Sequence, residues 1–112
     1  MYSFSYFNKY ILYKKRRDIC QFEITQAGDN TSELRHELRQ LENSMSEIKS
    51  VIDDYAPNRN DENNFADERL FLRCRYIDGL TMEKTAEMMS ISRNTVYRIK
   101  KKIEVQLIRR LS

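Results

Sequence analysis

The sequence is poor in turn-forming residues, with two glycines and a single proline among 112 residues. A β-sandwich or barrel needs a turn about every 8–12 residues, so this scarcity argues against an all-β protein. Hydrophobic residues make up 40% of the chain, which is enough for one modest core. We therefore predict an all-α fold.

Other scarcities limit the chemistry. Cys20 and Cys74 lie far apart and outside any CxxC pair, which excludes a zinc site and indicates a reducing compartment. The single histidine, His36, sits at an outward helical position and is expected to be solvated. The sequence contains no glycine-rich phosphate loop and no carboxylate pair in an apolar context. We predict no catalysis, no cofactor and no metal.

No apolar run approaches the ~18 residues that span a membrane, so we expect no membrane partner. The start of the chain is aromatic and then basic, the reverse of a secretory signal, which predicts a cytoplasmic protein. Charge is unevenly distributed along the chain. Residues 33–64 carry eight acidic and four basic side chains, whereas residues 80–112 carry three and eight. The basic end is the candidate for a polyanionic partner.

The first half reads as two helical segments. Residues 2–25 are rich in aromatics and fit one or two helices, and Gly28 provides a break. Asn30 or Thr31 is expected to cap the next helix. That helix carries an apolar heptad seam with alternating steps of four and three: Leu34, Leu38, Leu41, Met45, Ile48, Ile52 and Tyr55.

The seam has two explanations that the sequence leaves open. It could form a coiled-coil homodimer, or it could pack within the chain against the aromatic N-terminal helix. A hairpin that also dimerises would satisfy both. The run from Phe7 to Arg17 mixes aromatics with bases. It could follow a nucleic-acid backbone, but we favour a core-packing helix with a solvated basic end.

Pro57 ends the seam helix, and residues 57–64 read as a polar linker. We predict a helical assembly region at 1–56 and a second domain at 65–112. Its first helix should run from Phe65 to Ile77, with Gly79 at its end. The packing residues expected there are Phe65, Leu70, Leu72, Cys74 and Ile77.

Two short helices follow, each with its own cap. Thr81 should cap a helix over Met82–Met89, and Ser92 should cap a last helix running toward Leu111. On a wheel of 100° per residue, one face of the last helix carries an apolar stripe of Val96, Ile99, Ile103 and Leu107. The opposite face carries Asn94, Arg98 and Lys101, flanked by Tyr97 and Lys102.

This arrangement is typical of a helix-turn-helix, whose second helix enters the major groove of DNA. Arginine can make two hydrogen bonds to a guanine edge, and asparagine can do the same with adenine. Ser92, Thr95 and the free N–H groups at the helix start could bind phosphate. Lysines add attraction that is independent of sequence. In the preceding helix, Ala86 is small where the helices must approach closely, and Met82, Met89 and Ile91 should anchor the pair.

At these residues "YIDGLTMEKTAEMMSISRNTVYRIKKKI" resembles the fourth region of bacterial sigma factors. It is more similar still to the sigma-like helix-turn-helix of phage late-transcription regulators of the RinA/ArpU type. The resemblance covers about residues 65–111 and implies base contacts by Arg93, Asn94 and Arg98. Thr85 stands where sigma factors usually have an aliphatic residue. Asn94 replaces a common acidic residue, a departure that argues against a −35-type promoter as the target.

From the residues and the resemblance together, we predict a sequence-specific regulator of transcription that binds double-stranded DNA. The resemblance implies a phage-encoded activator of late genes, acting in a bacterial cytoplasm, with RNA polymerase as a further partner. Two alternatives remain. One is a sigma-like module that binds polymerase or another protein without reading DNA, and the other is the DNA-binding part of a transposition or packaging system.

Overall fold

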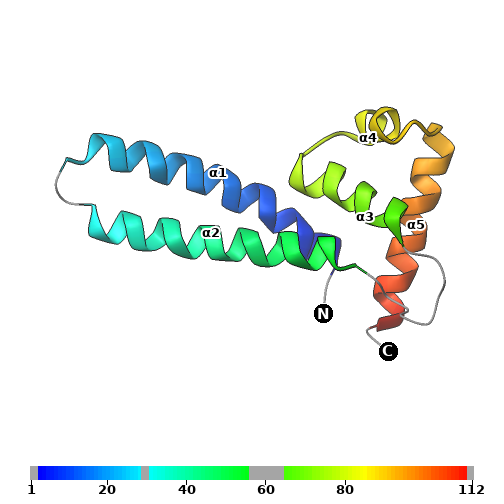
Figure 1. Ribbon diagram of the computed structural model, residues 1–112, viewed down its shortest axis with the longest axis horizontal. Coiled ribbons are helices and arrows are strands. Elements are labelled where there is room, and N and C mark those ends of the chain that lie inside the picture. Colours follow the sequence, from blue (N-terminus) through cyan, green and yellow to red (C-terminus); the bar gives the residue numbers. More distant parts are fainter. Residues whose placement is uncertain (1–2, 29–30, 56–64, 111–112) are drawn as a thin grey trace.

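The computed structural model describes residues 3–28, 31–55 and 65–110. In chain order the elements are α1 (Phe4–Gln26), α2 (Ser32–Asp53), α3 (Ala66–Leu72), a π-helical turn η1 (Arg73–Ile77), α4 (Met82–Met89) and α5 (Arg93–Arg110). The predicted all-α fold is confirmed. Helices α1 and α2 form a long hairpin, and α3, α4 and α5 gather at one end of it (Figure 1). None of the described helices is long and apolar enough to cross a membrane.

Helix α1 is one continuous helix of 23 residues. Its start is set by Ser3, whose hydroxyl accepts a hydrogen bond from the Tyr6 N–H at 3.3 Å. The expected break follows, at Gly28 with a φ of 66°. The expected cap of α2 is wrong in its chemistry: Thr31 precedes the helix but makes no capping bond, because its hydroxyl accepts from Arg35 Nε at 2.9 Å. The other expected cap, Asn30, lies outside the described residues.

The heptad seam of α2 packs against α1 of the same chain, so the intramolecular hairpin is present. Met45, Ile48, Ile52 and Tyr55 are buried within the single chain, and Leu34, Leu38 and Leu41 are half-buried. Polar contacts also join the two helices. Arg16 donates two hydrogen bonds to the Glu37 carboxylate, at 2.6 and 3.1 Å. A dimer through this seam stays a prediction.

One expected packing residue of the C-terminal part is wrong. Leu70 is 43% exposed, and Phe71, with no exposed surface, lies inside instead. The buried face of α3 (Ala66–Leu72) carries Glu68, Phe71 and Leu72, whereas Leu70 lies about 200° around from Glu68. The segment continues through η1, in which the Asp78 N–H bonds to the Arg73 carbonyl at 3.0 Å. Gly79 ends it, as expected, with a φ of 70°.

A single buried cluster joins the hairpin to the C-terminal helices. Phe7 of α1 and Ile52 of α2 belong to the same cluster as Phe71 of α3 and Leu107 of α5. Tyr55 strengthens this junction, because its hydroxyl bonds to Gln106 Oε1 of α5 at 2.6 Å. The expected linker, residues 57–64, lies outside the described residues, and the division into two domains stays a prediction. The shared core nevertheless connects the orientation of α5 to that of the hairpin.

Candidate nucleic-acid interface

Helices α4 and α5 meet through a three-residue turn, and both are capped as expected. The Thr81 hydroxyl accepts from the Lys84 N–H at 3.1 Å, and the Ser92 hydroxyl accepts from the Thr95 N–H at 3.2 Å. Between them, Ser90 adopts a left-handed conformation with a φ of 57°. The Ile91 N–H then reaches back to the Ala86 carbonyl at 3.0 Å, a helix-ending pattern. The turn therefore fixes the direction in which α5 leaves α4.

The inner face of α5 is the apolar stripe that the sequence predicts. Val96 and Ile103 have no exposed surface, and Leu107 is 6% exposed. Ala86 of α4 is buried in the same cluster. The other expected anchors are half-buried against this cluster, as is Ile99 of α5: Met82, Met89 and Ile91. Because the inner face is fixed by this packing, the opposite face of α5 must point to solvent.

The outer face of α5 brings together most of the predicted DNA-contact residues. Arg93, Asn94, Arg98 and Lys101 are exposed, and Tyr97 is 42% exposed. The Arg93 guanidinium carbon lies 5.8 Å from the centre of the Tyr97 ring, within the range of a cation–π contact. The exposed surface is therefore one amide and several long cations on one rigid helix.

Ser92 and Thr95 lie at the start of α5, where phosphate was expected. Ser92 is exposed and Thr95 is half-buried. Their hydroxyl oxygens are 2.8 Å apart, within hydrogen-bonding distance of each other. Each hydroxyl can still accept or donate a further bond, so this pair remains compatible with a phosphate contact.

Lys102 differs from the other predicted contact residues, because its ammonium nitrogen lies 2.9 Å from Oε1 of Glu68 on α3. Glu68 is 4% exposed, and the sequence reasoning did not identify it. The helical period could have found it, since Glu68 precedes Phe71 and Leu72 by one turn on the buried face. An acidic side chain in that position needs a cationic partner.

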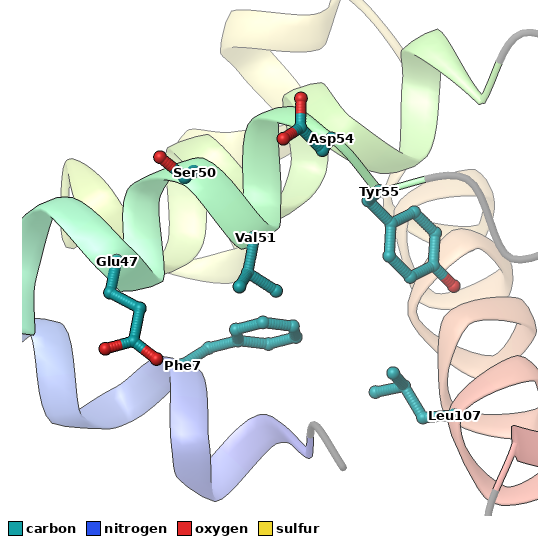
Figure 2. Close-up of a pocket in the computed structure, with 7 residues that line it drawn as sticks. All are labelled: Phe7, Glu47, Ser50, Val51, Asp54, Tyr55 and Leu107. Atoms are coloured by element: carbon teal, nitrogen blue, oxygen red, sulfur yellow. The ribbon is translucent and has the colours of Figure 1, made fainter.

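A separate hollow of about 300 Å³ lies where the hairpin meets the C-terminal end of α5. Figure 2 shows Phe7, Val51, Tyr55 and Leu107 turned toward one another, with Glu47 at the margin. Ser50 of α2 and Asp54, which follows the end of α2, complete the lining. Phe7, Val51 and Leu107 give the hollow an apolar floor, and Glu47 adds a carboxylate at its margin.

The remaining reactive groups are dispersed. Cys20 and Cys74 are buried free thiols, and burial raises the pKa of both above the ordinary value. His36 is exposed on α2. Across residues 3–28, 31–55 and 65–110, no three histidine, cysteine, aspartate or glutamate side chains gather in a way that could hold a metal ion.

Comparison with known families agrees with this geometry. Residues 66–107 match the family model Sigma-70, region 4, which describes a DNA-binding helix-turn-helix module. The matched segment runs from the start of α3 to Leu107 of α5, so it contains the turn and the whole outward face. No curated protein and no solved structure shows significant similarity to the chain. The C-terminal part is therefore similar to the DNA-binding helix-turn-helix of this family.

Proposed function

We propose that this chain is a transcription regulator that reads a specific sequence in double-stranded DNA by docking α5 in the major groove. The observation that carries the proposal is the two-sided character of α5. Val96, Ile103 and Leu107 hold one side in the core, and the other side exposes Asn94, Arg98 and Lys101. A rigid helix with an amide and a guanidinium on its free face has the donors and acceptors that base edges require.

Each side chain has a distinct role in this proposal. Arg93, Asn94 and Arg98 read base edges, Tyr97 supports Arg93 through its ring, and Lys101 contacts the phosphate backbone. Ser92 and Thr95 at the helix start bind a phosphate. The resemblance to phage late-transcription regulators further supports activation of late genes as the biological role, in a bacterial host.

The test is a selection of binding sites from random duplex DNA, followed by three substitutions measured on the selected site and on a scrambled duplex. Arg98→Ala should weaken binding to the selected site by about 1–3 kcal/mol and relax the preference at one base position. Asn94→Ala should relax a different position. Lys101→Ala should weaken binding to both duplexes alike and lower the salt slope by about one unit.

A merely adhesive basic helix would lose affinity uniformly in all three variants, and that result would reject sequence reading. The selection tests whether the chain recognises any DNA sequence at all. A chain that enriches no sequence from the random pool is not a sequence-specific regulator. The Arg98→Ala and Asn94→Ala variants should retain the helix content and melting temperature of the parent, since both side chains are exposed.

A second candidate function is contact with RNA polymerase through the hollow between the hairpin and α5. The apolar floor of the hollow lies beside the carboxylates of Glu47 and Asp54, which have no ion-pair partner among the described residues. This combination suits a segment that presents an apolar side chain beside a lysine or arginine. The double variant Glu47→Lys with Asp54→Lys should keep DNA affinity and lose transcription activation by purified polymerase. Equal activation by parent and variant would remove this surface from consideration.

Homodimerisation through α2 is also a proposal. Leu41→Asp places a charge on the half-buried part of the seam and should convert a dimer to a monomer in sedimentation. A parent that already sediments as a monomer would refute the dimer and leave the hairpin unaffected.

A further inference from the structure

The ion pair between Glu68 and Lys102 has unequal surroundings on its two sides. Glu68 is almost fully buried, with 5% of its side chain exposed, whereas 48% of the Lys102 side chain is exposed. The two groups lie 2.9 Å apart and join α3 to α5. A buried carboxylate without a partner is costly, so Glu68 holds its lysine firmly even though the lysine itself could reach solvent.

Lys102 also occupies a different side of α5 from its neighbour Lys101. At 100° per residue, Lys101 lies about 140° from Val96 in one direction, and Lys102 lies about 120° from it in the other. Lys102 therefore shares its side with Thr95, and both line a cavity of about 240 Å³ against Asp67 and Glu68. Lys101 lies toward the solvent-facing side, with Asn94.

Resting on the proposed function, we propose that Glu68 is a positioning residue that withholds Lys102 from the DNA backbone and so favours specific over non-specific binding. Arg98 borders the same cavity and has no ion-pair partner among the described residues. With Lys102 neutralised, the long cation that remains at this edge is the one suited to reading a base. This proposal differs from the sequence-based prediction that Lys102 contacts DNA, and the experiment below decides between the two.

Electrostatics favour a Lys102 that stays paired with Glu68. If Lys102 broke its pair with Glu68 to bind a phosphate, it would strand a buried carboxylate close to a polyanion, and a Lys102 that stays paired brings no net charge to the DNA. Asp67, exposed beside Glu68, adds a second negative charge at this edge. DNA affinity that does not depend on sequence comes from cations that displace counterions, and a lysine already paired with a carboxylate displaces none.

The test compares adjacent lysines by fluorescence anisotropy on the selected site and on a scrambled duplex, over a series of salt concentrations. Lys101→Gln should lower the slope of log affinity against log salt by about one unit. Lys102→Gln should leave that slope unchanged. Glu68→Gln should steepen it by about one unit and strengthen binding to the scrambled duplex more than to the selected site. The double variant Glu68→Gln with Lys102→Gln should return the slope to that of the parent.

The outcomes are separable. A parent that binds neither duplex refutes the proposed function and this inference with it. A parent that binds while Lys102→Gln lowers the slope as much as Lys101→Gln refutes the positioning role alone. Circular dichroism shows whether Glu68→Gln folds; if it does not, the comparison of the two lysine variants decides the matter by itself.

Discussion

Thr85 is the clearest defect in the packing of the helix-turn-helix, and its replacement by valine should stabilise the protein. Thr85 lies in α4 with no exposed surface, and its hydroxyl oxygen has no hydrogen-bond partner in the part of the chain that the structure describes. Burying such a group costs about 1–3 kcal/mol in proteins. Valine has the same branched shape and nearly the same helix propensity, so the change removes that cost without adding strain.

We expect Thr85→Val to raise the free energy of unfolding by about 1–2 kcal/mol. For a chain of this length that corresponds to a rise of about 4–8 °C in melting temperature. The assays are urea and thermal unfolding followed by circular dichroism. An unchanged slope against urea would show that the variant unfolds as the parent does.

A matched control lies one turn earlier on the same helix. Thr81 is exposed, and its hydroxyl caps α4 by accepting the Lys84 N–H, so Thr81→Val should lower stability by about 1 kcal/mol. The same chemical change thus has opposite expected signs at two positions. If Thr85→Val lowers the melting temperature, or if both variants shift it in the same direction, the hydroxyl of Thr85 is not the unsatisfied group inferred here.

Three further predictions concern stability. Ile48→Ala should lower the free energy of unfolding by about 2–5 kcal/mol. Because the core is shared, the hairpin and the C-terminal helices should still unfold in one transition, at a lower temperature than in the parent. Separate transitions by far- and near-ultraviolet circular dichroism would contradict the shared core. Val96→Asp should abolish DNA binding by unfolding the helix-turn-helix, with a loss of helix signal that exposed-face variants do not share. The hydrogen bonds from Arg16 hold the pKa of Glu37 below its ordinary 4.5. Their contribution to the stability of the fold is therefore present above pH 4.5 and disappears as the pH falls through the lowered pKa. Glu37→Gln should melt at a lower temperature than the parent near pH 7, and the two melting temperatures should converge in acid.

Period and capping chemistry made the C-terminal elements predictable. The apolar stripe of α5 repeats at helical spacing, and Thr81 and Ser92 mark the two helix starts by chemistry that acts within three residues. Such local signals do not depend on the rest of the fold. They were sufficient to predict which side of α5 faces solvent, and hence the exposure of Asn94, Arg98 and Lys101.

Features that depend on tertiary partners were harder to predict. Leu70 and Phe71 are both large and apolar, and composition cannot choose between them. The choice follows from how α3 is rotated as it packs, with Glu68, Phe71 and Leu72 on its inner side and Leu70 turned outward. The partner of the heptad seam could not be predicted for the same reason. A seven-residue repeat indicates that a helix packs against another helix, but not whether that helix belongs to the same chain or to a second copy.

Lys102 is the most instructive residue in this respect. On sequence alone it is one of three consecutive lysines, and the helical wheel places it beside the face that carries Lys101 without showing that it has an acidic partner. The difference comes from α3, which places a buried carboxylate beside one lysine and leaves the other in solvent. The charge that a lysine of α5 offers to a ligand therefore depends on the acidic side chains of the helices packed beside it, as well as on the residues of α5 itself. On the proposal that Glu68 neutralises Lys102, a count of basic residues along α5 overstates the charge available to DNA by this one pair.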